Sequence, residues 1–473
     1  MKGYFARLIG VGSLLVGLAA VVGEQGSAAD DSAGSGQSAA SSSLVGVETP
    51  AEGAAAVGDK AGPTPMAGTT TVGDKAGPAP AAEPAAAPDT QTAASICIAE
   101  GPGGVPGQIW FRSEYLHMWT RGDRIPVLAS TTPDNSAASL PGTTAYGDRT
   151  ILNGDHDGFR IALGMWLDPC HTWGLEAEYF DLGRAHDNYD SGVQNGYPFL
   201  LRPSTDSGGV LSANNYVGSQ TDRDPRNLFP LSASTAGSVA VQSDDYFQSV
   251  GVSLRRSLWS ADWSSDWQAV AWLDRNAHTI QIDGLLGYRF YRLADNLLIH
   301  EQKVGTGSAN EGQTIDVRDS FQGDNSFQGV DLGVSTLVTR GRWSVNMAGR
   351  LSLGDNRQAV NIAGQTTTVD SNGAAFPLGP GLLANAGNSG LHVHDEFAAV
   401  PHFNAEIGYQ VTNYWKIFAG YEAVYWNNVV RAGEEITSFG GLPVINAGGT
   451  TPFIWNTTSY WAQGVRLGAE VRY

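Results

Sequence analysis

From residue 108 to its end, the chain repeats short segments in which apolar residues alternate with polar or charged ones. The last segment, GVRLGAEVRY, places Val465 and Leu467 in one row and Arg466 and Glu470 in the other. Because successive side chains of a strand point to opposite faces, each segment predicts a strand with one apolar and one polar face. The segments are 108–120, 158–167, 172–182, 246–255, 279–292, 327–338, 343–354, 401–411, 414–426 and 459–473.

A soluble sheet with one wet face and a membrane barrel surrounded by lipid both produce this alternation. The connections discriminate between them, because short links alternate with long polar stretches, as in outer-membrane barrels with short periplasmic turns and long outer loops. The short links are 168–171, 339–342 and 412–413, the long stretches are about 121–157, 183–244, 293–326, 355–396 and 427–457, and only 256–278 is long where a short link is expected. We therefore predict an all-β fold, a transmembrane antiparallel up-and-down β-barrel of about ten strands, in preference to a soluble β-sandwich.

The N-terminal part has a different composition. Residues 1–29 carry Lys2 and Arg7, then an apolar run, then small residues, which is the layout of a secretory signal peptide and favours it over a membrane anchor. Residues 30–105 consist mainly of Ala, Gly, Ser, Pro and Thr and contain the heptapeptide VGDKAGP twice. Such a segment buries too little apolar area to offset its ordering entropy, which predicts a disordered linker. The barrel is expected to occupy residues 106–473, and no later stretch reaches the roughly 18 apolar residues of a membrane helix.

Three stretches resemble the beta barrel porin-7 family. The most specific is GYQVTNYWKIFAGYEAVYWNNVVRAGEEI at 408–436, and 158–183 and 347–367 resemble other recurrent stretches of that family. The resemblance covers roughly 108–473 and leaves the linker outside. It implies an outer-membrane location and a barrel fold, and it supplies no substrate or catalytic residue to carry over.

The polar rows of the predicted strands carry charges of both signs. In a barrel they point into the lumen, where they either brace the wall against itself or line a small pore. Ten strands lie near the narrow end of the range of barrel sizes, at which side chains fill the interior. The cationic candidates are Arg112, Arg160, Arg255, Arg289, Arg350, Lys416, Arg466 and Arg472, and the anionic ones are Glu114, Glu176, Glu178, Asp283, Asp331, Glu406, Glu422 and Glu470.

Two clusters rich in His and Asp fall at the predicted outer rim. Such side chains suit metal binding or acid–base catalysis, and they suit a hydrated rim equally. The chain contains no Gly-Xaa-Ser-Xaa-Gly elbow, so we expect no enzyme and assign no catalytic, cofactor-binding or metal-binding residue. The rim residues are Asp155, His156, Asp157, His392, His394 and Asp395.

The two cysteines, Cys97 and Cys170, both fall on the predicted periplasmic side, where disulfides persist. A bridge between them is therefore the favoured interpretation, and two free thiols are the alternative.

The terminal aromatic residue, Tyr473, resembles the C-terminal signal by which such barrels are recognised for assembly. The expected partners are outer-membrane lipid and the barrel-assembly machinery. A net charge of −19 argues against nucleic acid.

The sequence therefore predicts an outer-membrane barrel protein. Its first functional interpretation is a small-pore porin for small solutes. The alternatives are a closed structural or surface-interaction barrel without transport and, least favoured, a hydrolase at the rim.

Overall fold

The computed structural model describes residues 108–473 except 134–140, 196–198, 212–214, 219–234, 262–278, 308–310 and 447–449. The predicted signal peptide, the linker, Cys97 and most of the long 256–278 connection lie outside the described residues. Ten strands of the 13-stranded main sheet form the ring of the barrel: β1 (Ile109–Thr120), β6 (Asp155–Trp166), β7 (Trp173–Asp181), β12 (Thr235–Ala261), β13 (Thr279–Gly305), β14 (Thr314–Arg340), β15 (Trp343–Val369), β17 (Gly390–Gln410), β18 (Trp415–Val429) and β21 (Thr458–Arg472).

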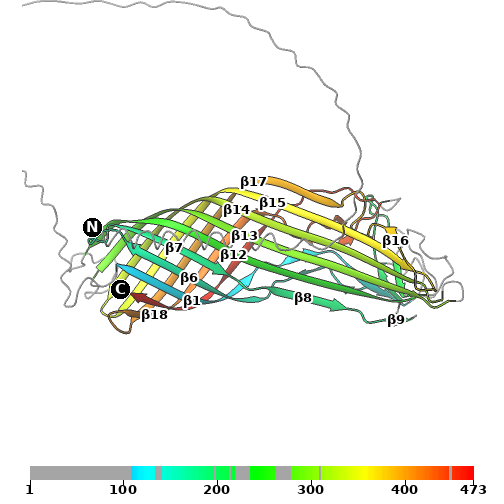
Figure 1. Ribbon diagram of the computed structural model, residues 1–473, viewed down its shortest axis with the longest axis horizontal. Helices are drawn as coiled ribbons and strands as arrows, with labels where there is room; N and C mark the ends of the chain where they lie inside the picture. The colour runs from blue at the N-terminus through cyan, green and yellow to red at the C-terminus, as the bar shows by residue number, and fades with distance from the viewer. Residues whose placement is uncertain are drawn as a thin grey trace, which may run out of the picture. The chain divides into compact units, whose positions relative to one another are not determined.

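These ten strands close into a barrel. Each pairs antiparallel with its neighbours in chain order, and β21 pairs with β1, as predicted. Backbone hydrogen bonds between Ile109 and Tyr473, of 3.1 and 2.8 Å, extend this seam to the last residue. In the closed sheet the backbone N–H and C=O groups of each strand form hydrogen bonds with both neighbouring strands. A protein in lipid requires this because the bilayer core offers no water as a partner. The predicted all-β barrel is thus confirmed (Figure 1).

The shorter strands lie in the connections at one end of the barrel, which we call the long-loop end. The opposite, short-turn end carries the turns β6–β7, β14–β15 and β17–β18. β8 and β9 continue along β12 beyond β7, β16 pairs with β15, and a separate sheet has the order β11-β10-β3-β4. The short strands are β2 (Asp123–Ile125), β3 (Ala129–Thr132), β4 (Thr143–Tyr146), β5 (Arg149–Ile151), β8 (Ala185–Asp190), β9 (Gln194–Asn195), β10 (Phe199–Arg202), β11 (Asn215–Gly218), β16 (Ala375–Gly379), β19 (Ser438–Phe439) and β20 (Leu442–Pro443).

The strands on one side of the barrel are much longer than predicted. β12, β13, β14 and β15 each have 27 residues, or about 90 Å at roughly 3.3 Å per residue. A bilayer core is only about 30 Å thick. The prediction that 293–326 and 355–396 are loops is therefore largely wrong: the wall continues through most of both stretches and forms an extension beyond the membrane.

The sequence patterns did not predict the extension because the apolar row changes from the outward face to the inward face within each of these long strands. In β13, Leu286 points outward and is 53% exposed, whereas Leu297, eleven residues on, points inward and is fully buried. Above Arg292 the outward row mixes polar residues, such as Asn296 and His300, with small or apolar ones, such as Ala294 and Leu298. The lower part meets lipid outside and charge inside; the upper part meets water outside and encloses an apolar core.

The outward apolar residues of the lower part form a belt about eleven residues tall, the length a tilted barrel strand needs. On β15 the belt runs from Trp343 to Leu353, and the next outward residue is Asp355. Within the described part of the chain there is no helix that is long and apolar enough to cross a membrane.

Candidate functional site

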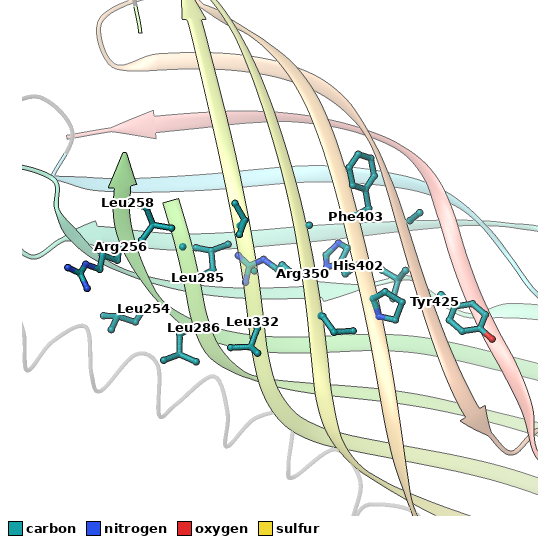
Figure 2. Close-up of a pocket in the computed structure, with 18 of the residues that line it drawn as sticks. Leu254, Arg256, Leu258, Leu285, Leu286, Leu332, Arg350, His402, Phe403 and Tyr425 are labelled. Atoms are coloured by element: carbon teal, nitrogen blue, oxygen red, sulfur yellow. The ribbon is translucent and has the colours of Figure 1, made fainter. Parts of the chain in front are cut away.

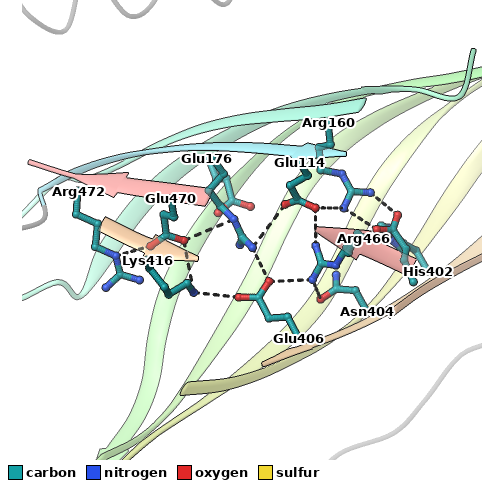
Figure 3. A network of polar contacts seen from close by, with 12 residues as sticks. Glu114, Arg160, Glu176, His402, Asn404, Glu406, Lys416, Arg466, Glu470 and Arg472 are labelled. Carbon is teal, nitrogen blue, oxygen red and sulfur yellow. Dashed lines mark hydrogen bonds and ion pairs between the residues drawn. The ribbon is translucent and has the colours of Figure 1, made fainter. Parts of the chain in front are cut away.

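The inward row of the belt region is a layer of charged side chains. All sixteen lumen candidates from the sequence lie in it, eight cations and eight anions, and we call it the charge layer. Figure 3 shows the part of it around Glu406. Alternation places them there, because on each strand the residues between two outward apolar positions must point inward. The members are Arg112, Glu114, Arg160, Glu176, Glu178, Arg255, Asp283, Arg289, Asp331, Arg350, Glu406, Lys416, Glu422, Arg466, Glu470 and Arg472.

One branch of the charge layer centres on Glu406, which is 4% exposed. Its carboxylate accepts hydrogen bonds from Arg466 at 2.9 Å and Lys416 at 3.0 Å, and from Arg112. Arg466 also donates to Glu114 at 3.0 Å. Side chains from the four consecutive strands β17, β18, β21 and β1 thus meet inside the lumen, and these bonds tie together strands that are not direct neighbours.

The same branch continues toward the aromatic residues above. Arg160 bridges Glu114, at 3.5 Å, and Glu422, at 2.6 Å. His402 approaches the Glu422 carboxylate to 2.9 Å.

The second branch lies on β7 and β12–β15. Arg350 pairs with Asp331 at 2.8 Å and with Glu176 at 3.2 Å. Arg255 pairs with Glu176 at 2.9 Å and with Asp283 at 3.2 Å. Arg289 pairs with Glu178 and with Asp331. Every charge of the layer has an opposite partner, so the layer is neutral as a whole.

Two small spaces lie around the charge layer among the residues that the structure describes. A vestibule of about 130 Å³ at the short-turn end is lined by Trp110, Trp166, His171 and members of the layer. A second space of about 30 Å³ lies beside Arg160 and Arg350 and has room for about two water molecules. The space inside the layer is thus much smaller than the vestibule at its edge.

Above the charge layer, six aromatic side chains fill the lumen, and we call them the aromatic layer. Phe247 lies at the centre, with ring centroids 5.0 Å from Tyr460 and 5.3 Å from Phe180. Trp426 packs on Tyr291 and Phe327 at 6.0 and 6.1 Å. All six are 2% exposed or less. Aromatic rings at these separations attract one another and exclude water. The members are Phe180, Phe247, Tyr291, Phe327, Trp426 and Tyr460.

The chain after β18 turns into the lumen instead of leaving as a loop. Residues 430–436, which we call the plug segment, lie next to the aromatic layer, where the Arg431 guanidinium carbon is 5.6 Å from the centroid of the Tyr460 ring. The turn begins at Asn428, whose φ of +53° is a left-handed conformation that Asn tolerates better than most residues. Its carbonyl oxygen accepts hydrogen bonds from Asn356 at 2.7 Å and Gln358 at 2.6 Å. Asn325 then exchanges two 2.8 Å hydrogen bonds with the backbone of Val430.

Arg431 anchors the plug segment in a group of buried carboxylates. Its guanidinium donates to Asp295 at 2.7 Å and to Asp245 at 3.3 Å. Asp123 accepts from the Gly433 amide at 2.6 Å. Glu435 completes this acid cluster, which comprises Asp123, Asp245, Asp295 and Glu435. Sequence reasoning missed the cluster; its one local signal was the WNNVVRAGEEI end of the family segment.

The extension above the plug segment is packed like a soluble core. Apolar side chains from the inward rows of β12–β15 meet side chains of the connections, including Leu128, Leu200 and Leu383. Arg202 on β10 reaches Asp319 at 2.9 Å and Glu301 at 3.2 Å inside this core. The predicted outer loops therefore fold into the barrel and fill it.

A broad hollow of about 1190 Å³ lies on the wall itself (Figure 2). Its outward lining includes Leu254, Leu286, Leu332 and Phe403, all within the lipid belt. Gly349 deepens it, because a Cβ there would meet nothing within 4 Å. The lining also includes Leu285, Arg350 and His402 of the inward row. In a bilayer the outward part of the lining is in contact with acyl chains.

The predicted rim clusters are not brought together as one site. Asp155 and Asp157 point outward on β6, where Asp157 contacts His117 at 2.8 Å, whereas His156 points inward and contacts Asp245 at 3.1 Å. On β17, His392 stacks on Phe453 with ring centroids 3.7 Å apart. The remaining residues are His394, which meets the edge of Trp455, and Asp395, paired in register with Arg357.

Among the residues that the structure describes, no three His, Cys, Asp or Glu side chains are arranged to hold a metal ion. Cys170 lies in the β6–β7 turn. Because Cys97 is outside the described residues, the Cys97–Cys170 disulfide stays a prediction.

A family model described as "Putative beta barrel porin-7 (BBP7)" matches residues 110–473. No curated protein matches the chain. Three solved structures show distant likeness. The outer membrane protease OmpT from Escherichia coli is 8% identical, with 77% of this chain and 96% of that chain covered and a TM-score of 0.35.

The second is a Pseudomonas aeruginosa FadL homologue, 6% identical, with 77% and 89% covered and a TM-score of 0.19. The third is the Ralstonia pickettii toluene transporter TbuX, 11% identical, with 78% and 90% covered and a TM-score of 0.16. At these identities and TM-scores the three likenesses carry no argument about function.

Proposed function

The chain belongs to the beta barrel porin-7 family, and we propose that it is an outer-membrane barrel with a closed lumen, serving a structural or surface-interaction role without transport. The observation that carries this proposal is the stack of charge layer, aromatic layer and plug segment, each of which occupies the lumen with buried side chains. The extension, which raises a large surface beyond the membrane, supports the surface role. We further propose that residues 1–29 direct secretion and that the protein is not an enzyme.

A small-pore porin is the second candidate. The family description and the vestibule of about 130 Å³ at the short-turn end favour it. For solutes to pass, however, the aromatic layer would have to move, because its six rings lie directly above the charge layer. The two candidates differ in one measurable property, ion conductance.

The full chain, refolded and inserted in a planar bilayer, is expected to give no discrete conductance steps at neutral pH. The reason is that buried side chains of the charge layer and the aromatic layer occupy the lumen one above the other. An open porin measured in the same bilayer provides the positive control, and reproducible single-channel steps from this protein would refute the closed lumen.

Tyr473 is 69% exposed, and its backbone forms the last hydrogen bonds of the β21–β1 seam. We expect deletion of Tyr473 to reduce the amount of assembled, heat-modifiable barrel in membranes several-fold, because both the seam and the proposed terminal signal for the assembly machinery are lost. Tyr473→Phe keeps the aromatic ring and backbone and should assemble normally. Equal yields for the deletion and the wild type would contradict the signal role.

A further inference from the structure

The acid cluster holds more negative charge than its surroundings neutralise. Its four carboxylates are each 4% exposed or less. Arg431 is the cation that contacts it, and His156 adds a second positive charge only when protonated. If all four carboxylates were ionised, the cluster would remain negative even with both partners charged. A buried net charge of this kind is strongly unfavourable.

The hydrogen bonds show which carboxylates lack compensation. Asp245 and Asp295 contact Arg431, as described above. Asp123 has only the Gly433 amide, and its second oxygen has no hydrogen-bond partner. Glu435 is 2% exposed, and no cation among the described residues pairs with its carboxylate; the stabilising group is the backbone amide of Asn456. Glu435 and Asp123 are therefore the positions at which the cluster needs a proton.

The groups that face the cluster come from every element packed on it. Asp245 is on β12, Asp295 on β13, Asp123 on β2, His156 on β6 and Tyr460 on β21, and the plug segment itself adds Glu434, Glu435 and Arg431. Arg431 lies among these carboxylates and repels a metal cation. A bound proton is the ligand that fits.

Burial raises the pKa of Glu435 to about 8; the backbone amide of Asn456 opposes the shift, and repulsion from Asp123, Asp295 and Glu434 adds to it. Burial likewise raises the pKa of Asp123, to which Asp295 contributes. At any pH between about 4, the ordinary pKa of a carboxyl group, and about 8, the pKa in the seated segment, the seated segment binds more protons than the loosened one. Seating is therefore strongest at low pH and weakens as pH rises to about 8.

We propose that residues 430–436 form a proton-retained plug: protons on Glu435 and Asp123 keep the segment seated in the lumen beneath the core of the extension, and their loss loosens the segment together with the part of that core that packs on it. The inference rests on the proposed closed lumen, and loosening changes the long-loop end while the aromatic layer beneath stays in place.

Thiol labelling of the full-length protein in membranes tests this inference. Ala432→Cys places a thiol in the plug segment at a position 1% exposed, and Ser371→Cys places one in the exposed turn after β15. The ratio of their labelling rates by a membrane-impermeant maleimide removes the intrinsic pH dependence of thiol reactivity, and the wild-type chain gives the background. We expect this ratio to rise at least about tenfold between about pH 6.5 and about pH 9.5.

The proton dependence is tested in two backgrounds, Glu435→Gln and Glu435→Gln with Asp123→Asn. Both should flatten the rise, the double variant more fully, and the single variant serves alone if the double does not assemble. Heat-modified gel mobility verifies the barrel at each pH. A flat ratio in the otherwise wild-type chain, or an unchanged rise with Glu435→Gln, would overturn the proposal. Conductance at about pH 6.5 tests the closed lumen separately, because labelling of position 432 does not depend on ion flow.

Discussion

Replacing Glu406 with Gln is expected to lower the free energy of unfolding by about 3–5 kcal/mol, the usual effect of removing one partner from a buried ionic network. Glu406 accepts hydrogen bonds from three cations, Arg112, Lys416 and Arg466. With Gln at position 406 these cations share only Glu114 and Glu470, and a neutral layer acquires a net positive charge in a nearly dry lumen.

The measurement is urea or guanidinium unfolding of the refolded barrel in detergent or vesicles, followed by tryptophan fluorescence and gel mobility. Asp148→Asn provides the matched control, since it removes the carboxylate from an exposed pair with Arg124 at 3.0 Å. Such exposed pairs contribute about 0–1 kcal/mol. A loss for Glu406→Gln no larger than that of the control would show that the charge layer is more hydrated than its burial indicates.

Replacing Trp426 with Ala is expected to cost about 3–5 kcal/mol, the range for truncating a large buried aromatic. Trp426 is fully buried and packs on Phe247, Tyr291 and Phe327, so its removal leaves a cavity between the charge layer and the plug segment. Neighbouring rings are held by the strands and can collapse into that space only in part.

The same unfolding assay measures this effect, and Phe376→Ala is the control because Phe376 on β16 is 50% exposed. Its truncation should change stability by less than about 1 kcal/mol, as is usual for surface positions. If Trp426→Ala were equally mild, the aromatic layer would be a loosely packed set of rings and the closure of the lumen would have to rest on the other layers.

The period-two alternation was enough to predict the ten strands and the inward direction of the charged residues. Lipid makes the rule strict: an outward charge such as Arg350 or Glu406 would sit in hydrocarbon, so both must point inward. The sequence pattern could not predict which cation pairs with which anion. Glu406 meets Arg112 across 294 positions of sequence, a separation at which no local pattern operates.

The extension and the plug segment were hidden for two different reasons. The extension keeps its alternation but exchanges the faces, so Leu293 and Leu297 are inward where the belt has polar side chains. The plug segment depends on one left-handed residue, Asn428, and on partners that come from other strands. The acid cluster combines residues from β2, β12, β13 and the plug segment, and its charge imbalance exists only once the chain is folded.

The reversal of the two faces along β13 has a consequence for mutational tolerance. Below Arg292, the outward row accepts residues suited to lipid, such as Leu286, and the inward row accepts charge, such as Arg289. Above it, the outward row accepts Asn296 and the inward row requires Leu297. The effect of a substitution in this barrel therefore depends on its height along the strand as well as on the face it occupies. We expect replacement of the outward Leu286 by Asn to be damaging in lipid and replacement of the outward Leu298 by Asn to be mild.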